Sequence, residues 1–288
     1  MHAFTTLIDA ATLSELLARD ERAGNLALFD CRFDLANTRW GAAEFAAAHL
    51  PGAHHLDLDR DLSGPITAAS GRHPLPDPQA LARRLGELGV DASMQIVAYD
   101  QGNGAYAARL WWLARWIGLT NVAVLDGGIA AWRAAGLPLE TAVRSPRPRA
   151  LEARVDANAW VSTADVNALR ERQGTLIVDA RGAERFAGRN ETLDSVAGHV
   201  PGARNLPFLG NLGADGRFLP ADALRRRWSV FLGSMPATSV VAMCGSGVTA
   251  CHNLLALEHA GFPGARLYAG SWSEWIRDPH RPVATGAH

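Results

Sequence analysis

Four short motifs occur twice in this chain and keep the same order, and this duplication is the strongest constraint on its fold. The paired motifs are FDCR (29–32) and VDAR (178–181), AHLPGA (48–53) and GHVPGA (198–203), IVAYDQGNG (96–104) and VVAMCGSG (240–247), and DGGIAAW (126–132) and AGSWSEW (269–275). The offset drifts little, from 149 residues between Asp30 and Asp179 to 143 between Gly127 and Gly270. Random matches would not keep both order and spacing, and the period is far longer than a solenoid repeat. The sequence therefore predicts two copies of one domain.

The predicted boundaries follow from the limits of the two copies. We expect a first domain at 1–140, a linker at 141–159 and a second domain at 160–288. The linker is rich in Pro, Arg and Ala and belongs to neither copy, so an ordered or semi-rigid connection is expected. The total of 288 residues is enough for two ordinary domains, each with its own core.

Short apolar runs alternate with helical stretches in each copy. In the second copy the expected strands are 175–179, 239–243 and 265–268, and the helices between them include 163–173 and 221–228. This alternation is typical of an α/β domain in which helices cover both faces of a parallel sheet.

Cys244 directly follows the predicted strand 239–243, and a helix is expected from Val248 to Ala260. Ligands of open α/β sheets bind at this end of the strands. The glycines of the loop 245–247 let several backbone N–H groups converge on one point, and the helix adds its positive end. Such a setting stabilises a thiolate, so we predict that Cys244 is a nucleophile. The alternative is an inert buried cysteine between a strand and a helix.

The first copy carries Asp100 where the second carries Cys244, so the reactive site is expected in the second copy alone. Two other activities of such loops are disfavoured. A cysteine phosphatase needs an arginine six residues after the cysteine, and position 250 is Ala250. The segment GNGAYA (102–107) lacks the third glycine of a dinucleotide-binding loop.

Composition excludes several partner classes. The net charge of −1 gives no reason to expect nucleic acid or an anionic membrane, and no apolar run approaches membrane-spanning length. The start of the chain lacks the features of a signal peptide, and Cys31, Cys244 and Cys251 make no disulfide framework. We therefore expect a cytoplasmic protein. No metal-ligand cluster is visible, so no metal is expected.

With these residues in view, the chain resembles the two-domain rhodanese-like sulfurtransferases over essentially its full length. The doubled domain, Asp100 in place of a first cysteine, the H-[LV]-P-G-A motifs and GSWSEW (270–275) carry the resemblance. The loop CGSGVTA (244–250) is similar to that of 3-mercaptopyruvate sulfurtransferases, whereas the thiosulfate enzymes usually carry charged residues after the cysteine.

The resemblance implies an enzyme that moves sulfur from 3-mercaptopyruvate to a thiophilic acceptor through a persulfide on Cys244, with release of pyruvate and without a cofactor. The acceptor would be cyanide, a small thiol or a thioredoxin-like protein. The loop residues Gly245, Gly247, Val248 and Thr249 would bind the donor. Two alternatives stay open: thiosulfate as the true donor, or a non-catalytic sulfur carrier or binding module.

The resemblance also implies a proton relay of Ser246, His73 and Asp59, with Asp57 as a substitute for Asp59. Donor carboxylates are best held by arginine. The resemblance assigns this role to Arg185.

The family commonly has a second arginine a few residues before the second H-x-P-G-A motif, and Thr192 stands at about that place here. Either Arg189 replaces it or the donor pocket is built differently.

Overall fold

The structure is a computed structural model that describes residues 3–20 and 24–286, and the chain divides into two compact units. The first unit comprises Met1–Gly64, Pro76–Asp156 and Ala214–Phe218, and the second comprises Pro65–Leu75, Ala157–Gly213 and Leu219–His288. The segment Pro65–Leu75 therefore belongs to the second unit, although it lies within the first copy in sequence. This assignment places His73 in the same unit as Cys244.

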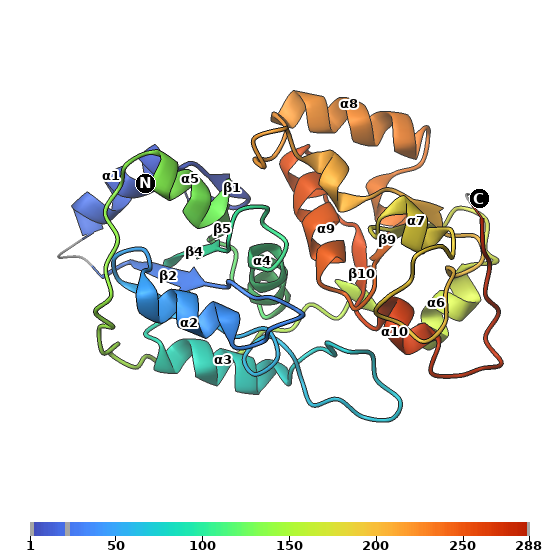
Figure 1. Cartoon of the computed structure of the whole chain (residues 1–288), viewed down its shortest axis with the longest axis horizontal. Coiled ribbons are helices and arrows are strands. Elements are labelled where there is room, and N and C mark those ends of the chain that lie inside the picture. The colour runs from blue at the N-terminus through green and yellow to red at the C-terminus, as the bar shows by residue number, and fades with distance from the viewer. Residues whose placement is uncertain (1–2, 21–23, 287–288) are drawn as a thin grey trace. The chain divides into compact units, whose positions relative to one another are not determined.

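The first unit is built on a sheet of five parallel strands in the order β1-β5-β4-β2-β3 (Figure 1). The strands are β1 (Leu7–Ile8), β2 (Leu26–Asp30), β3 (Ala53–His55), β4 (Gln95–Tyr99) and β5 (Val122–Leu125). The helices are α1 (Ala10–Asp20), α2 (Trp40–Ala47), α3 (Pro78–Glu87), α4 (Ala107–Trp116) and α5 (Gly128–Ala134).

The second unit repeats this topology with the order β6-β10-β9-β7-β8, again with parallel pairing (Figure 1). Its strands are β6 (Trp160–Val161), β7 (Leu176–Asp179), β8 (Arg204–Asn205), β9 (Val240–Met243) and β10 (Arg266–Tyr268). Its helices are α6 (Thr163–Leu169), α7 (Ala183–Phe186), α8 (Ala221–Leu232), α9 (Thr249–His259) and α10 (Ser271–Trp275), with short 3-10 turns η1 (Phe208–Asn211) and η2 (Ala237–Ser239).

The central strands are continuous apolar runs because both faces of each sheet are covered. All four residues of β5, β7 and β9 are buried. In the first unit, side chains of α1, α2 and α5 form one core cluster with the sheet, and Trp132 of α5 is fully buried in it. In the second unit the matching cluster includes Phe186, Trp272 and Trp275. The predicted pair of helix-covered parallel sheets is confirmed.

Two predicted helix ends are wrong by several residues. Helix α6 ends at Leu169 rather than at 173, because the last residue that packs on the core is Leu169 and the polar run after it ends in Gly174 at φ +83°. Helix α8 extends to Leu232 because Trp228 and Leu232 continue its buried stripe.

The second half of the predicted linker is hydrogen-bonded to the first unit. The N–H of Arg149 donates to the carbonyl of Gly86, and that of Arg154 donates to the carbonyl of Ile117. These bonds hold an otherwise extended segment in place without regular secondary structure.

Candidate active site

Cys244 lies at the carboxyl end of β9, and its side chain is buried in a loop of small residues. The N–H of Gly247 donates to the Sγ atom of Cys244 at 3.2 Å, and the N–H of Cys244 donates to Oγ of Ser271 at 3.0 Å. Gly247 has φ +79°, and a Cβ built there would overlap the carbonyl oxygen of Ala269. Glycine is therefore required at 247 to turn a backbone N–H toward the sulfur.

The start of helix α10 holds the rest of the loop. The N–H of Trp272 donates to the carbonyl of Cys244 at 3.0 Å, and the N–H of Ser273 donates to that of Gly245 at 2.8 Å. Ser271 has φ +53°, and its hydroxyl donates to the carbonyl of Tyr268. The motif GSWSEW thus shapes the loop around the cysteine.

The two predicted loop residues Val248 and Thr249 stand at the start of helix α9. Val248 is the N-cap residue and Thr249 the first helical residue, so this 11-residue helix begins five residues after Cys244. Behind it, the Sγ atom of Cys251 donates to the carbonyl of Gly247 at 3.3 Å. Cys251 thus packs beneath the loop as a fully buried residue.

His73 and Ser246 meet in the second unit. The Nδ1 atom of His73 lies 2.7 Å from Oγ of Ser246, and both side chains are buried. This distance fits a hydrogen bond through which a proton can move between the hydroxyl and the imidazole.

Asp59, the third predicted member of the relay, belongs to the first unit. It lies in a turn in which its N–H and that of Arg60 donate to Oδ1 of Asp57. Burial, and secondarily the charge of Asp57, raise the pKa of Asp59. The carboxylate of Asp57 thus stabilises this turn. The place of Asp59 in the relay stays a prediction.

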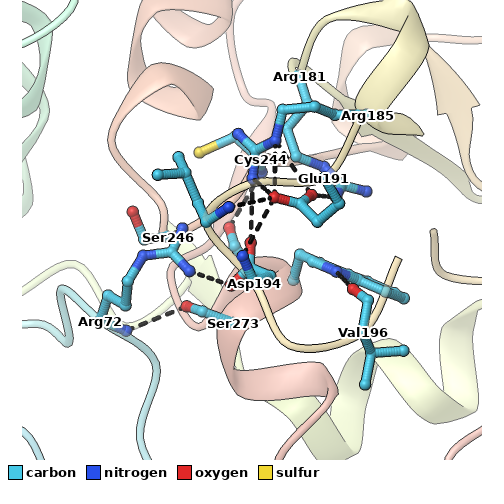
Figure 2. A network of polar contacts seen from close by, with 12 residues as sticks. Arg72, Arg181, Arg185, Glu191, Asp194, Val196, Cys244, Ser246 and Ser273 are labelled. Carbon is cyan, nitrogen blue, oxygen red and sulfur yellow. Dashed lines mark hydrogen bonds and ion pairs between the residues drawn. The ribbon is translucent and has the colours of Figure 1, made fainter. Parts of the chain in front are cut away.

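Arg185 lies on α7 in a cluster of carboxylates (Figure 2). Its Nε and Nη2 atoms donate to Glu191 at 2.9–3.1 Å, and Nη2 also donates to Oδ2 of Asp194 at 3.0 Å. Burial tends to raise the pKa of Glu191, but the bonds from Arg185 and from backbone N–H groups outweigh it, and the pKa is lowered. The side chain of Arg185 remains 24% exposed.

Arg72 joins the same cluster, although the sequence alone did not indicate it. Its Nη1 atom pairs with Oδ1 of Asp194, the carboxylate that also accepts from Arg185 (Figure 2). Arg189, the candidate for the second arginine, instead pairs with Glu184 at a solvent-exposed position. The one signal that could have pointed to Arg72 is its place directly before His73.

A third arginine near the loop, Arg181, serves the fold. Its guanidinium binds Asp179 and the carbonyl of Gly198, and in the first copy Arg32 makes the same contacts with Asp30 and the carbonyl of Ala48. Because the pair occurs in both copies, including the one without a cysteine, its shared role is to join the strand to the H-x-P-G-A segment. Burial opposes the charge of Arg181, but Asp179 and its other partners raise the pKa.

Asp100 fills the loop of the first unit that corresponds to the Cys244 loop. Asp100 directly follows Tyr99, the last residue of β4, and Tyr99 pairs with Asp30 of β2. In the second unit Cys244 directly follows Met243 of β9, and Met243 pairs with Asp179 of β7. The two carboxylate oxygens accept four backbone N–H bonds at 2.9–3.3 Å, from residues 102, 104, 106 and 107. The loop is therefore an anion-binding nest that a built-in carboxylate occupies.

The described residues hold no group of three or more His, Cys, Asp or Glu side chains that could bind a metal ion. Over residues 3–20 and 24–286, none of the helices combines the length and apolar character needed to cross a membrane. The three cysteines are free and buried.

Comparison with known proteins agrees with this architecture. The family model described as "Rhodanese-like domain" matches residues 10–135 and 162–278. The chain is 50% identical over 277 residues to the "Probable 3-mercaptopyruvate sulfurtransferase" of Pseudomonas aeruginosa, covering 96% of this chain and 97% of that protein. It is 38% identical over 284 residues to the "Putative thiosulfate sulfurtransferase SseB" of Mycobacterium tuberculosis, covering 96% of each.

Solved structures give the same result. The 3-mercaptopyruvate sulfurtransferase of Leishmania major is 30% identical with a TM-score of 0.83, over 96% of this chain and 76% of that one. SseA from Escherichia coli is 31% identical with a TM-score of 0.78, over 94% of this chain and all of that one. With a doubled parallel fold, a cysteine loop in the second copy and relatives of this kind over nearly its whole length, the chain belongs to the rhodanese family.

Proposed function

We propose that this protein is a sulfurtransferase that takes sulfur from 3-mercaptopyruvate and passes it to a thiophilic acceptor through a persulfide on Cys244. The observation that carries the proposal is the Cys244 loop, in which the N–H of Gly247 donates to the sulfur at the carboxyl end of β9. The name of the relative that is 50% identical supports 3-mercaptopyruvate as the donor.

In the first half-reaction the Cys244 thiolate attacks the sulfur of 3-mercaptopyruvate. A sulfur–sulfur bond forms, the carbon–sulfur bond of the donor breaks, and its electron pair leaves with pyruvate as the enolate. The enolate takes up a proton and becomes pyruvate. The loop N–H groups stabilise the negative charge on the sulfur, as an oxyanion hole does for oxygen.

In the second half-reaction an acceptor attacks the outer sulfur of the persulfide, and the Cys244 thiolate leaves in its original state. Cyanide, a small thiol or a thioredoxin-like protein can each supply the attacking group. The donor carbon keeps the electron pair of the broken carbon–sulfur bond in the first half-reaction, and the Cys244 sulfur regains an electron pair when the acceptor removes the outer sulfur, so the proposed cycle needs no external oxidant or reductant.

Ser246 and His73 are proposed to transfer the proton to the leaving group. Their 2.7 Å contact lets the hydroxyl give a proton to the enolate while the imidazole replaces it. Asp59 stays a predicted third member of this relay. Arg185 is proposed to orient the donor carboxylate, since a guanidinium binds a carboxylate through two parallel bonds.

Thiosulfate is the second candidate donor, because a relative 38% identical over 96% of the chain carries the name of a thiosulfate sulfurtransferase. The loop argues for 3-mercaptopyruvate, since uncharged Gly245 and Ser246 follow the cysteine. A non-catalytic sulfur carrier would keep the cysteine but would not turn over. We also propose a cytoplasmic location, on the ground of three free cysteines.

The test compares steady-state turnover of 3-mercaptopyruvate and thiosulfate, with cyanide as acceptor, by the wild type and by Cys244→Ser. We expect the larger kcat/KM with 3-mercaptopyruvate and no turnover by the variant. Intact mass after donor treatment should show one added sulfur atom on the wild type. A larger kcat/KM with thiosulfate would reverse the choice of donor, and sulfur loading without turnover would indicate a carrier.

A further inference from the structure

We propose that Ser273 is a positioning residue for proton transfer, because it holds together the two chain segments whose next residues are His73 and Ser246. The inference deepens the proposed function and rests on it. Ser273 acts on the reaction through the distance between the imidazole and the hydroxyl, and the donor is bound by other residues.

The backbone of Ser273 binds one of these segments and its hydroxyl binds the other. Its N–H donates to the carbonyl of Gly245 at 2.8 Å, and its Oγ atom accepts from the N–H of Arg72 at 3.0 Å (Figure 2). Ser246 directly follows Gly245, and His73 directly follows Arg72. The 2.7 Å contact between Nδ1 of His73 and Oγ of Ser246 is therefore one residue away from Ser273 along each segment.

The hydroxyl of Ser273 is buried and has a defined direction. It donates to the carbonyl of Gly270 at 3.4 Å, which leaves a lone pair on Oγ for the N–H of Arg72. An N–H that loses its acceptor away from water costs free energy. The segment Pro65–Leu75 is therefore held at Arg72, in register with Ser273.

Close packing beside this bond restricts the segment further. A Cβ built on Gly71 would lie 2.7 Å from the carbonyl oxygen of Gly270 and 2.8 Å from Oγ of Ser273. The N–H of Gly71 also donates to Oε2 of Glu274 at 3.4 Å. Helix α10 thus holds the backbone at two successive residues, directly before His73.

The first copy forms the same turn without this hydroxyl. The paired motifs DGGIAAW (126–132) and AGSWSEW (269–275) align Ala130 with Ser273. The N–H of Ile129 donates to the carbonyl of Asp100 at 2.9 Å, so the start of the helix still binds the loop in the copy that has no cysteine. The hydroxyl is therefore not needed to build the turn, and it occurs in the copy in which the imidazole has to be placed.

The test measures the two half-reactions of Ser273→Ala separately. Pyruvate release in a single turnover of 3-mercaptopyruvate reports the first, and discharge of the preloaded persulfide to cyanide reports the second. We expect pyruvate release to slow about tenfold, the scale of one hydrogen bond that positions a reacting group. Discharge to cyanide needs no proton from the imidazole, so its rate should stay within about twofold of the wild-type rate. Ser229→Ala, at an exposed serine of the same unit, is the matched control.

A double-variant cycle separates positioning from a general role in folding. In the Ser246→Ala background the hydroxyl of Ser273 has no proton transfer left to serve, so Ser273→Ala should slow pyruvate release by less than about twofold. A tenfold loss in this background as well would overturn the proposal. Equal slowing of both half-reactions, or an unchanged rate of pyruvate release in the single variant, would also overturn it.

Gly71→Ala tests the same contact from the other segment, and it replaces Ser273→Ala if that variant is unstable. Its added methyl group would meet Oγ of Ser273 and the carbonyl of Gly270, so the backbone before His73 has to shift. We expect slower pyruvate release with discharge to cyanide near the wild-type rate, and slowing of both would contradict the proposal. Failure of the proposed function is seen separately, as absent turnover of 3-mercaptopyruvate by the wild type, and it would remove this inference with it.

Discussion

The Nδ1 atom of His73 lies 2.7 Å from the Oγ atom of Ser246, although the two residues are 173 positions apart in the chain. They meet because the segment Pro65–Leu75 leaves the first unit and belongs to the second. Ser246 is two residues from Cys244, so this contact connects an imidazole to the immediate surroundings of the sulfur. We propose that this buried pair transfers a proton during turnover.

Replacing either member of this pair should slow sulfur transfer. We expect Ser246→Ala and His73→Gln each to lower kcat with 3-mercaptopyruvate by about a hundredfold, the lower end of the usual contribution of general acid–base catalysis. The double variant should be little worse than either single one, because the two groups act as a unit. Losses that multiply would show that the two side chains act independently.

The three cysteines should differ sharply in their importance. Cys244→Ser should abolish transfer from every donor, because a serine hydroxyl is not appreciably ionised at neutral pH. Cys31→Ser and Cys251→Ser should keep most of the activity, since both residues are fully or almost fully buried structural side chains. Steady-state assays and intact mass after donor treatment check this. If Cys251→Ser were as inactive as Cys244→Ser, the assignment of a single sulfur carrier would be wrong.

Arg185→Met should impair the use of 3-mercaptopyruvate far more than it affects folding. The loss of a charge-assisted contact costs about 1.5–3 kcal/mol, which corresponds to roughly a ten- to hundredfold decrease in kcat/KM. Thermal unfolding of the variant should stay close to that of Arg189→Met, the exposed control. An unchanged kcat/KM would remove Arg185 from the donor site.

Glu191→Gln should change how stability depends on pH. The pKa of Glu191 is lowered from its ordinary value of 4.5, because the bonds from Arg185 and from backbone N–H groups outweigh the effect of burial. Ionised Glu191 therefore stabilises the folded protein above about pH 4.5, and this contribution is lost as the pH falls through the lowered pKa.

The free energy of unfolding in urea, measured from about pH 6 to about pH 3, checks this prediction. The difference between the wild type and Glu191→Gln should be largest near pH 6 and should shrink below about pH 4.5. The control is Glu87→Gln, which removes a carboxylate from a side chain that is 66% exposed. A difference that stays constant over the whole range would contradict the prediction.

Asp100→Cys should not create a second working site. Its loop is built around a carboxylate that accepts four N–H bonds, and Arg32, at the position of Arg181, is followed by no counterpart of Arg185. The variant should lose about 1–3 kcal/mol of stability, since buried N–H groups are left without their acceptor. Burial raises the pKa of Asp100, whereas these bonds oppose the rise.

Intact mass after donor treatment checks this on Asp100→Cys combined with Cys244→Ser, with Cys244→Ser alone as the control. One donor-derived sulfur atom on the double variant, absent from the control, would show that the first loop is competent and that the asymmetry of the two copies has another cause.

The sequence by itself determined the doubled α/β fold and the position of Cys244. Both depend on local patterns: apolar runs such as 240–243 bury both faces of a strand, and the glycines at 245 and 247 mark the loop that follows. The place of Ser246 within that loop follows from the same pattern, whereas its predicted role comes only from the resemblance to the sulfurtransferases. Repetition of motifs added the domain organisation, because copies of one fold keep order and spacing.

The tertiary structure alone decided which charges surround the loop. Arg72, Arg185 and Asp194 come from separate stretches of the chain, and no periodicity relates position 72 to position 194. Their meeting depends on the path of Pro65–Leu75 into the second unit, which the contacts of Gly71 and Arg72 with the start of α10 determine. Arg189, one candidate for the family's second arginine, pairs with Glu184 on the surface. A long side chain reaches whichever partner the packed backbone brings near, so its contacts cannot be read from its position in the chain.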